Sequence, residues 1–386
     1  MEKRNGGLNI LFFNWEYPPN GSGIGRYNAI ITAALRRKGN FCVTVTSTAP
    51  DLPLVEETDG GIIYRLCAKE DMGAPEQVGK LLEIAARHKA DIIEGADHLG
   101  HCAALLRNNN RPPVCIKLHY NDVLHDLRYA QAAYFWQRPL IWLACVRQRQ
   151  RLAAERFSIE AADFVTAPSK AIVAKARMQG LNLPASTVTL PNPVELPKFW
   201  HNAEAEKPIL LMVGRIDFGK GIQYLPNLLR VVRQRFPSAV LEIAGADSSA
   251  RGIPSLLLWL SKRIESDALQ YLGVLHQESL DAAYRRAWVV LSPSKWDTFP
   301  NSVLEAMSRS KAVAASPCGG AQEMLAGTEN PVARPDRLEF AEAVCRLLAD
   351  CGLRRRAGAQ GRSKAEREYA PDKAAEAYVR FFEKNL

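Results

Sequence analysis

The chain has 386 residues, 47% of them hydrophobic, which is enough for two packed domains of roughly 180 residues each. No stretch approaches the ~18 consecutive apolar residues that a membrane-spanning helix needs. The net charge of +9 indicates an anionic partner. The eight cysteines form no C-x2-C pair or His/Cys cluster, so we expect reduced thiols, no zinc and a cytoplasmic protein.

In the first half, short apolar runs alternate with amphipathic segments. Apolar runs of this length predict strands, and a period near 3.6 residues predicts helices. Strands separated by helices pair in parallel, so we expect an α/β domain with helices on both faces of a parallel sheet. Strands are predicted over 8–14, 41–48, 62–66, 91–96, 114–118 and 164–167, and helices over 26–37, 78–87, 102–106 and up to about 156.

A glycine-rich loop lies between the first strand and the first helix. It runs from Tyr17 to Tyr27 and contains Gly21, Gly23 and Gly25. Glycines let the backbone approach a phosphate or a sugar closely, although a purely structural turn is the alternative. The spacing differs from Gly-x-Gly-x-x-Gly and no acid closes the next strand, which disfavours a nicotinamide dehydrogenase.

Polar residues follow two later strands of this half. His119 comes directly after the strand 114–118, and Asp97 and His98 come after the strand 91–96. Because ligands bind at the carboxyl ends of parallel strands, these side chains are candidates for a site. A lone histidine is as often structural as functional, and both interpretations of His119 stay open.

A basic region extends from residue 138 to residue 177, with eight Lys or Arg against three acids, and aromatic residues lie just before it. Arginines beside aromatic residues predict either peripheral contact with an anionic membrane at its cytoplasmic face, or a long helix with solvated arginines. No nucleic-acid-binding motif accompanies the basic residues, so nucleic acid is not expected as a partner.

The second half repeats the strand and helix alternation after a proline-rich boundary. Four prolines fall between residues 190 and 208, so we place an N-terminal domain at 1–195 and a second domain at 196–370. The second domain begins with a predicted strand at 209–213 and a helix at 222–235. Arg215 and Lys220 lie between them, where both cations can converge on an anion, although solvated loop charges are the alternative.

The stretch from 291 to 323 predicts a strand, a loop, a helix and a second strand. Asp297 lies in the loop, Glu305 lies in the first turns of the helix, and Asn301 and Ser302 are suitable N-cap residues. The second strand, 312–315, leads to Gly319 and Gly320. This edge is expected to bind a nucleotide or a sugar phosphate.

These motifs together resemble the retaining glycosyltransferases of the GT-B fold, family four, glycosyl transferases group 1. The resemblance rests on Gly214-Arg215 with Lys220-Gly221, on Asp297 through Glu305, and on Gly-Gly-x-x-Glu at 319–323. The family usually has Glu where this chain has Asp297, and Gly where it has Pro300. The resemblance implies two Rossmann-like domains that face a central cleft, with the final helix, 371–386, crossing back to the first domain.

The resemblance also implies site roles. It assigns His119, Arg215, Lys220 and Asp297 to catalysis, and Asp97, His98 and Tyr27 to the acceptor side. The donor-binding residues are then Gly23, Gly25, Arg215, Lys220, Asp297, Phe299, Pro300, Asn301, Ser302, Val303 and Glu305.

The implied activity is retaining, metal-independent transfer of a hexose-type sugar from a UDP- or GDP-linked donor to a glycan, lipid-linked or small-molecule acceptor. No cofactor is expected, because the nucleotide sugar is a co-substrate. The alternatives are a sugar-nucleotide epimerase, a phosphorylase of related fold, and a non-catalytic nucleotide-sugar-binding subunit.

Overall fold

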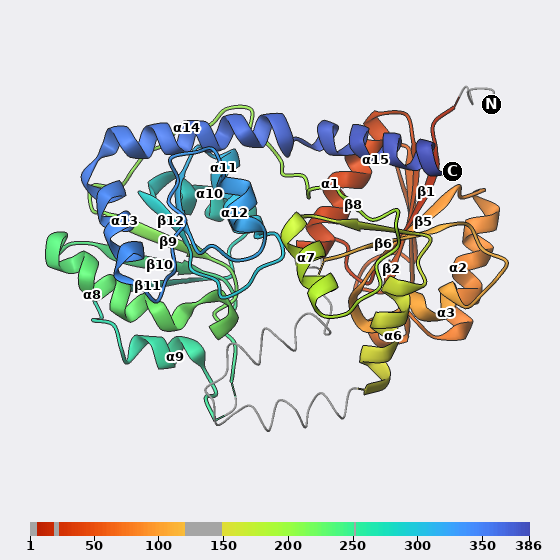
Figure 1. Ribbon diagram of the computed structural model, residues 1–386, viewed down its shortest axis with the longest axis horizontal. Helices are drawn as coiled ribbons and strands as arrows, with labels where there is room; N and C mark the ends of the chain where they lie inside the picture. Colours follow the sequence, from red (N-terminus) through yellow and green to blue (C-terminus); the bar gives the residue numbers. More distant parts are fainter. Residues whose placement is uncertain (1–5, 19–22, 120–148, 251) are drawn as a thin grey trace. The chain divides into compact units, whose positions relative to one another are not determined.

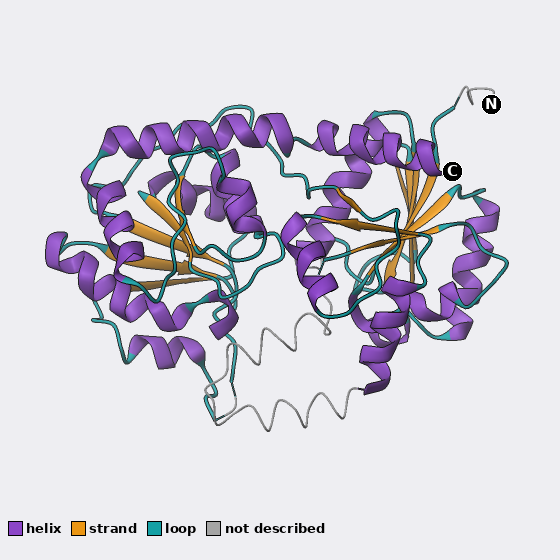
Figure 2. Ribbon diagram, in the orientation of Figure 1, coloured by secondary structure: helices purple, strands orange, loops and turns teal. Residues whose placement is uncertain are grey.

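The computed structural model describes residues 6–18, 23–119, 149–250 and 252–386, which form two compact units (Figure 1). The first unit comprises Met1–Pro193 together with Tyr369–Leu386, and the second is Val194–Glu368. In each unit, helices cover the strands of a central sheet on both faces (Figure 2). The predicted α/β class with two doubly wound domains is confirmed.

The described part of the first unit contains an eight-stranded sheet in the order β3-β4-β2-β1-β5-β6-β7-β8. All neighbouring strands are parallel except β3 and β4, which form an antiparallel pair at one edge. The sequence prediction missed β3 because Val55 is the one strongly apolar residue in its four positions. The strands are β1 (Asn9–Phe13), β2 (Phe41–Ser47), β3 (Val55–Thr58), β4 (Gly61–Cys67), β5 (Ile92–Ala96), β6 (Val114–Lys117), β7 (Phe164–Ala167) and β8 (Val188–Thr189).

Strand β1 shows why helices must cover both faces of this sheet. Alternate residues of a strand point to opposite faces, and every residue from Ile10 to Phe13 is buried. Leu11 and Phe13 belong to one apolar cluster, whereas Ile10 and Phe12 belong to a second cluster on the other face. The helices of this unit are α1 (Gly23–Arg37), α2 (Pro75–Arg87), α3 (Cys102–Leu106), α6 (Arg149–Glu160), α7 (Lys170–Met178) and α15 (Pro371–Asn385).

The C-terminal helix α15 is part of the first unit. Tyr378 and Phe382, one helical turn apart, are fully buried in the same cluster as Phe12. Arg37 pairs with Asp372 at 2.9 Å, which joins the end of α1 to the start of α15.

The second unit contains an all-parallel sheet of five described strands in the order β11-β10-β9-β12-β13. The strands are β9 (Ile209–Val213), β10 (Val240–Ala244), β11 (Leu269–Gly273), β12 (Val289–Ser292) and β13 (Ala312–Ala315). The helices are α8 (Leu225–Arg235), α9 (Leu256–Ser261), α10 (Gln277–Arg286), α11 (Asn301–Ser308), α12 (Gly320–Leu325), α13 (Leu338–Ala349) and α14 (Cys351–Glu368).

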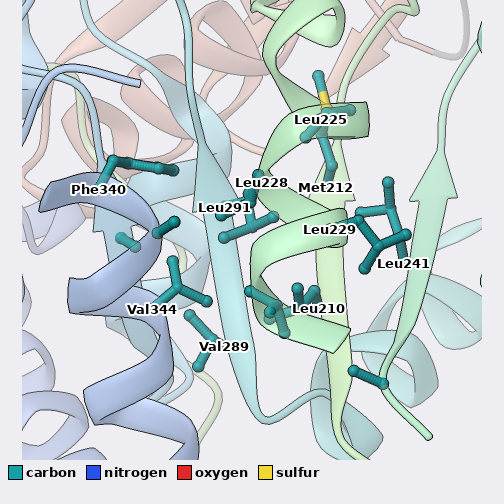
Figure 3. Close-up of a cluster of buried hydrophobic side chains, with 14 of the residues drawn as sticks. Leu210, Met212, Leu225, Leu228, Leu229, Leu241, Val289, Leu291, Phe340 and Val344 are labelled. Atoms are coloured by element: carbon teal, nitrogen blue, oxygen red, sulfur yellow. The ribbon is translucent and has the colours of Figure 1, made fainter. Parts of the chain in front are cut away.

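The core of this unit lies between its sheet and helices α8 and α13 (Figure 3). Leu210 and Met212 on β9 and Leu291 on β12 belong to one buried cluster with Leu228 on α8 and Val344 on α13. Full burial of one such side chain contributes about 1.5 to 3 kcal/mol, so this layer holds β9 and β12 in place. The loops that leave these two strands therefore start from a rigid base.

Candidate functional site

The order of strands in the second unit reverses beside β9. From β9 the chain goes to β10 and then outward to β11, and it returns to place β12 on the opposite side of β9. In parallel sheets, ligands bind outside the carboxyl ends of the strands at such a reversal, because the two loops diverge there. The loops after β9 and β12 are therefore the first place to look for a site.

The loop after β9 carries Arg215 and Lys220. Asp217 shapes this loop, because its carboxylate accepts a hydrogen bond from the Lys220 backbone N–H at 2.8 Å. The Arg215 side chain is 60% exposed and lies 3.4 Å from Asp217, so most of its guanidinium is accessible to a ligand. Gly221 has a φ of 87°, and a Cβ there would lie 2.0 Å from the Pro293 carbonyl oxygen in the loop after β12.

The loop after β12 carries Asp297, and the Asp297 carboxylate forms an ion pair with the Lys220 ammonium group. The backbone joins the same two loops, because the Lys295 N–H donates to the Gly219 carbonyl at 2.8 Å. Burial lowers the pKa of the Lys295 ammonium group. The structure therefore brings together Lys220 and Asp297, two of the residues that the sequence predicted for this edge.

Gly319 and Gly320, which follow β13, hold the Asp297 loop from the other side. Gly319 has a φ of 61°, and a Cβ at this position would lie 1.6 Å from the Asp297 carbonyl oxygen. The Gly320 N–H donates to that same oxygen at 3.1 Å. Only glycine permits so close an approach of the two backbones. Gly319 and Gly320 therefore hold Asp297 in its position.

Ser316 and Cys318 add side-chain contacts to this junction. The Ser316 hydroxyl and the Cys318 thiol both donate to the Ser294 carbonyl oxygen, the thiol at 2.7 Å. Burial raises the pKa of the Cys318 thiol to about 11, which keeps the thiol protonated at neutral pH. Cys318 therefore has a structural contact in this loop rather than the properties of a nucleophile.

Helix α11 begins directly after the Asp297 loop. Its N-cap is Pro300, without a side-chain hydrogen bond, so the prediction of Asn301 or Ser302 as N-cap is wrong: both are already inside the helix. Phe299 and Val303 are buried, which leaves the backbone and the two polar residues as the parts of this segment that a ligand can reach.

Glu305 lies on α11 and is only 5% exposed. The fully buried Tyr284 on α10 donates its hydroxyl to Glu305 Oε2 at 3.0 Å. A buried carboxylate needs such partners, because leaving one unpaired costs several kcal/mol. The sequence prediction named Glu305 but missed Tyr284, since a tyrosine on an amphipathic helix gives no sign of a polar partner.

The first sheet has a similar reversal beside β1, between the loops after β1 and β5. Trp15 follows β1 and His98 follows β5, with their ring centroids 6.0 Å apart. In the loop before α1, the Glu16 carboxylate accepts the Gly25 N–H at 3.2 Å. Gly23 is the first residue of α1, whereas Gly21 lies outside the described residues.

His119 lies at the carboxyl end of β6 and is 8% exposed. Its backbone N–H donates to Asp97 Oδ1 at 3.1 Å, and its ring packs edge-on against Tyr27 with centroids 4.7 Å apart. Burial, with Lys117 and His98 nearby, holds the pKa of His119 well below its usual value, so the ring is neutral. His119 Nε2 has no hydrogen-bond partner among the described residues.

Two residues expected on the acceptor side, Asp97 and Tyr27, are buried and make internal hydrogen bonds. Asp97 is fully buried and fixes the His119 backbone. Tyr27 is buried on α1, and its hydroxyl bonds to Glu94 at 2.8 Å and to Tyr378 at 2.6 Å. The hydroxyl of Tyr27 therefore bonds within the first unit, and its place on the acceptor side stays a prediction.

Glu94 and Lys117 are buried ionisable residues that the sequence prediction missed. Burial raises the pKa of Glu94 to about 7 and lowers the pKa of Lys117 to about 8. The Lys117 ammonium lies 5.2 Å from the Tyr27 ring and donates to the Leu190 carbonyl at 2.5 Å. Each of the two is a charged residue inside a predicted apolar strand. This pattern could have identified both from the sequence.

His98 remains a candidate for the acceptor side. Burial, followed by the charges of Arg151 and Lys69, lowers the pKa of His98 to about 3, so its ring is neutral. The aromatic residues beside the predicted basic region, with Arg138 and Arg147, lie at 120–148, outside the described residues, whereas the other six basic residues lie within them. Within the part that is described, Arg151 lies 3.6 Å from the buried Glu155.

Within the described ranges, no helix has the length and hydropathy to cross a membrane. The same ranges contain no cluster of three or more His, Cys, Asp or Glu side chains suited to a metal ion.

The two units define a GT-B glycosyltransferase architecture, and comparisons with solved structures support it. Sucrose-phosphate synthase from Thermosynechococcus elongatus superposes with a TM-score of 0.78 over 98% of each chain, at 21% identity. HepE from Anabaena, in complex with UDP-glucose, superposes with a TM-score of 0.74 over 98% of this chain and 100% of its own, at 16% identity.

Sequence comparisons give the family. Residues 22–193 match the glycosyl transferase 4-like domain, and residues 207–350 match glycosyl transferases group 1. An uncharacterised glycosyltransferase of Methanocaldococcus jannaschii is 25% identical over 90% of each chain, and the alpha-D-kanosaminyltransferase of Streptomyces kanamyceticus is 31% identical over 39% of each. The chain belongs to the GT-B glycosyltransferases of the family-four type.

Proposed function

We propose that the chain is a retaining glycosyltransferase that moves a hexose-type sugar from a UDP- or GDP-linked donor to a hydroxyl group of a glycan, lipid-linked or small-molecule acceptor. The observation that carries this proposal is the pairing of Lys220 with Asp297 where the second sheet reverses. One edge then offers a cation for a diphosphate and a carboxylate for sugar hydroxyls. HepE, of the same fold, is described in complex with UDP-glucose, which supports a nucleotide sugar as donor.

The proposed chemistry depends on the leaving diphosphate. Breaking the bond between the anomeric carbon and the phosphate oxygen places negative charge on the diphosphate and oxocarbenium character on the sugar. Lys220 and the exposed Arg215 supply cations beside the position where this charge develops. Charges that are already in place stabilise a transition state without reorganising, so these cations lower the barrier.

We assign Glu305 to the donor ribose and Asp297 to hydroxyls of the transferred sugar. Glu305 lies on the second turn of α11, behind the segment from Phe299 to Val303. Backbone N–H groups at the start of a helix favour anions, so a phosphate at this end of α11 would bring the ribose within reach of Glu305.

Retention follows if the acceptor attacks the face from which the diphosphate departs. The acceptor oxygen then forms a bond to the anomeric carbon as the phosphate oxygen leaves, and that phosphate oxygen takes the acceptor proton. A neutral His119, with its unpartnered Nε2 at the end of β6, is suited to hydrogen-bond a sugar hydroxyl. In this scheme Arg215 and Lys220 neutralise the diphosphate, so the reaction is metal-independent.

The experiment is a thermal-shift screen with UDP-, GDP- and ADP-sugars, followed by turnover with the stabilising donor and mixed acceptors. A donor at ~100 times its dissociation constant adds roughly 2.7 kcal/mol of stability. We expect stabilisation by one nucleotide series and a product with the anomeric configuration of the donor, read by NMR. An inverted product, or no stabilisation by any donor, would refute the proposal.

The same assay separates the alternatives. Conversion of the donor without acceptor would indicate an epimerase, and cleavage of a glycoside by orthophosphate would indicate a phosphorylase. Binding without any turnover would indicate a non-catalytic subunit.

A further inference from the structure

We propose that Tyr284 is a positioning residue that sets the orientation of the Glu305 carboxylate toward the donor ribose. This inference rests on the proposed assignment of Glu305 to the ribose, and it adds a residue on a different helix. Tyr284 lies on α10, whereas Glu305 lies on α11. It acts through Glu305 and is not expected to touch the donor, because its side chain is fully buried.

The geometry gives the Tyr284 hydroxyl a defined partner. Its oxygen lies 3.0 Å from Glu305 Oε2 and 3.3 Å from the Ser302 carbonyl oxygen. A phenol has one hydrogen to donate, and a hydrogen bond to a carboxylate is shorter and stronger than one to a neutral carbonyl. The hydrogen therefore points to Glu305, and the carbonyl of Ser302 is the secondary acceptor.

Fixing one carboxylate oxygen also decides where the other one points. A glutamate side chain loses rotamer entropy when it is held in one conformation. In this protein, that entropy is lost when the chain folds and not when the ligand binds. Tyr284 and Glu305 both belong to the second unit, and their hydrogen bond is part of its fold. Preorganisation of this kind increases affinity for a ligand that needs the carboxylate in one direction.

A second connection joins α10 to the residue that follows α11. The Arg309 guanidinium, just after α11, donates to Asp281 on α10 through Nε at 2.9 Å and Nη2 at 2.6 Å. It also lies 5.1 Å from the Tyr284 ring, and its Nη1 donates to the Glu305 backbone carbonyl at 3.2 Å. Arg309 supports the backbone of Glu305 and Tyr284 supports its carboxylate, so the two contributions can be separated by mutation.

The test compares binding of ribose and 2′-deoxyribose nucleotides. UDP, GDP, ADP and their 2′-deoxy forms are titrated calorimetrically into the wild type, Tyr284→Phe and Asp281→Asn. The phenylalanine keeps the ring and removes the hydroxyl, so we expect the ribonucleotide to bind about tenfold more weakly, as for loss of a hydrogen bond to a charged group. The 2′-deoxynucleotide should change less than twofold, and the matched control Asp281→Asn should keep the wild-type ratio between the two nucleotides.

A double-mutant cycle with Glu305→Gln keeps the test decisive even if Tyr284→Phe is less stable. If Tyr284 acts through the carboxylate, the double variant should bind the ribonucleotide no more weakly than Glu305→Gln alone. With the intact donor, Tyr284→Phe should raise KM and leave kcat within about twofold, because uniform binding is removed.

Failure of this inference differs from failure of the proposed function. If the wild type discriminates against 2′-deoxynucleotides and Tyr284→Phe discriminates equally, Tyr284 has no positioning role while the ribose assignment stands. If neither the wild type nor Glu305→Gln responds to the 2′-hydroxyl, the ribose assignment is wrong and the inference falls with it.

Discussion

Lys220 and Asp297 form an ion pair across 77 residues of sequence, at the point where the second sheet reverses its strand order. The two side chains are 26% and 15% exposed, so the pair is partly shielded from water and still open to a ligand. A diphosphate that binds here meets a lysine that already has a carboxylate partner. This relationship determines how each residue should respond to mutation.

Loss of either cation should slow turnover as well as weaken donor binding. We expect Arg215→Ala and Lys220→Ala each to cost about 2 to 4 kcal/mol, or roughly a hundredfold or more in kcat, because charge on the diphosphate grows in the transition state. Arg215→Lys should also be impaired, since lysine cannot form two parallel bonds to phosphate. Steady-state kinetics with the cognate donor measures all three variants.

The control for this series is Arg230→Ala, which removes an exposed arginine on α8 that donates to Asn227. It should leave kcat unchanged. If Arg215→Ala and Lys220→Ala fold and turn over like the control, the phosphate site lies elsewhere.

Replacing Asp297 by asparagine should separate binding of the diphosphate from turnover. Asp297→Asn removes the negative charge that competes for Lys220, so we expect UDP or GDP alone to bind a few-fold more tightly, and more so at low salt. Turnover should fall, because the carboxylate for the sugar is lost. Calorimetry at two ionic strengths measures the first effect, and weaker binding of the free nucleotide would contradict it.

Gly319→Ala should displace the Asp297 loop. The added Cβ would lie 1.6 Å from the Asp297 carbonyl oxygen, and φ is 61°. We expect a loss of about 2 kcal/mol or more in the free energy of unfolding, together with weaker donor binding. Gly327→Ala is the matched control, because φ is 78° there and a Cβ meets nothing within 4 Å. Urea unfolding of both variants should show a clearly larger loss for Gly319→Ala.

The stability of the first unit should fall as pH rises through the range in which Glu94 titrates. Burial raises the pKa of Glu94 from 4.5 to about 7, so the folded state holds this proton more tightly than the unfolded state. The stabilisation that this proton gives the folded state is fully present below pH 4.5 and is lost as the pH rises to about 7. The free energy of unfolding falls over this range by an amount on the order of 3 kcal/mol. Glu94→Gln, which still accepts from Tyr27, should flatten this part of the stability profile.

Urea unfolding from pH 5 to pH 8 measures the effect. Lys117, Tyr378 and Cys115 lie around the same site, and the lowered pKa of Lys117, about 8, adds a slope of opposite sign at higher pH. An unchanged slope in Glu94→Gln below pH 7 would assign the pH dependence to other groups.

Chelation should leave the transferase reaction intact. If Arg215 and Lys220 neutralise the diphosphate, dialysis against EDTA should change kcat by less than about twofold, because no ion has to stabilise the leaving group. The measurement is turnover before and after chelation, with restoration by Mg²⁺ or Mn²⁺ as the control. A loss that either ion restores would show that a metal shares this role.

The sequence predicted the alternation of strands and helices well, because apolar periodicity is a local property of the chain. The strands 164–167, 209–213 and 312–315 have the bounds that their periodicity predicted. The antiparallel strand β3 was missed because an exposed edge strand needs few apolar residues. The N-cap of α11 was misplaced because two residues after Pro300 have equally good capping side chains.

What the sequence determined by itself was the set of chemical groups at the candidate site: Arg215, Lys220, Asp297, Glu305 and the glycines around them. Their spacing along the chain fixes which of them follow a strand and which begin a helix. Only the tertiary structure decided which loops become neighbours, because the reversal of strand order beside β9 depends on packing between distant segments. The same packing buries Tyr27 under α15 and places Tyr284 against Glu305, since burial and hydrogen-bond partners are properties of the folded chain and not of its local sequence.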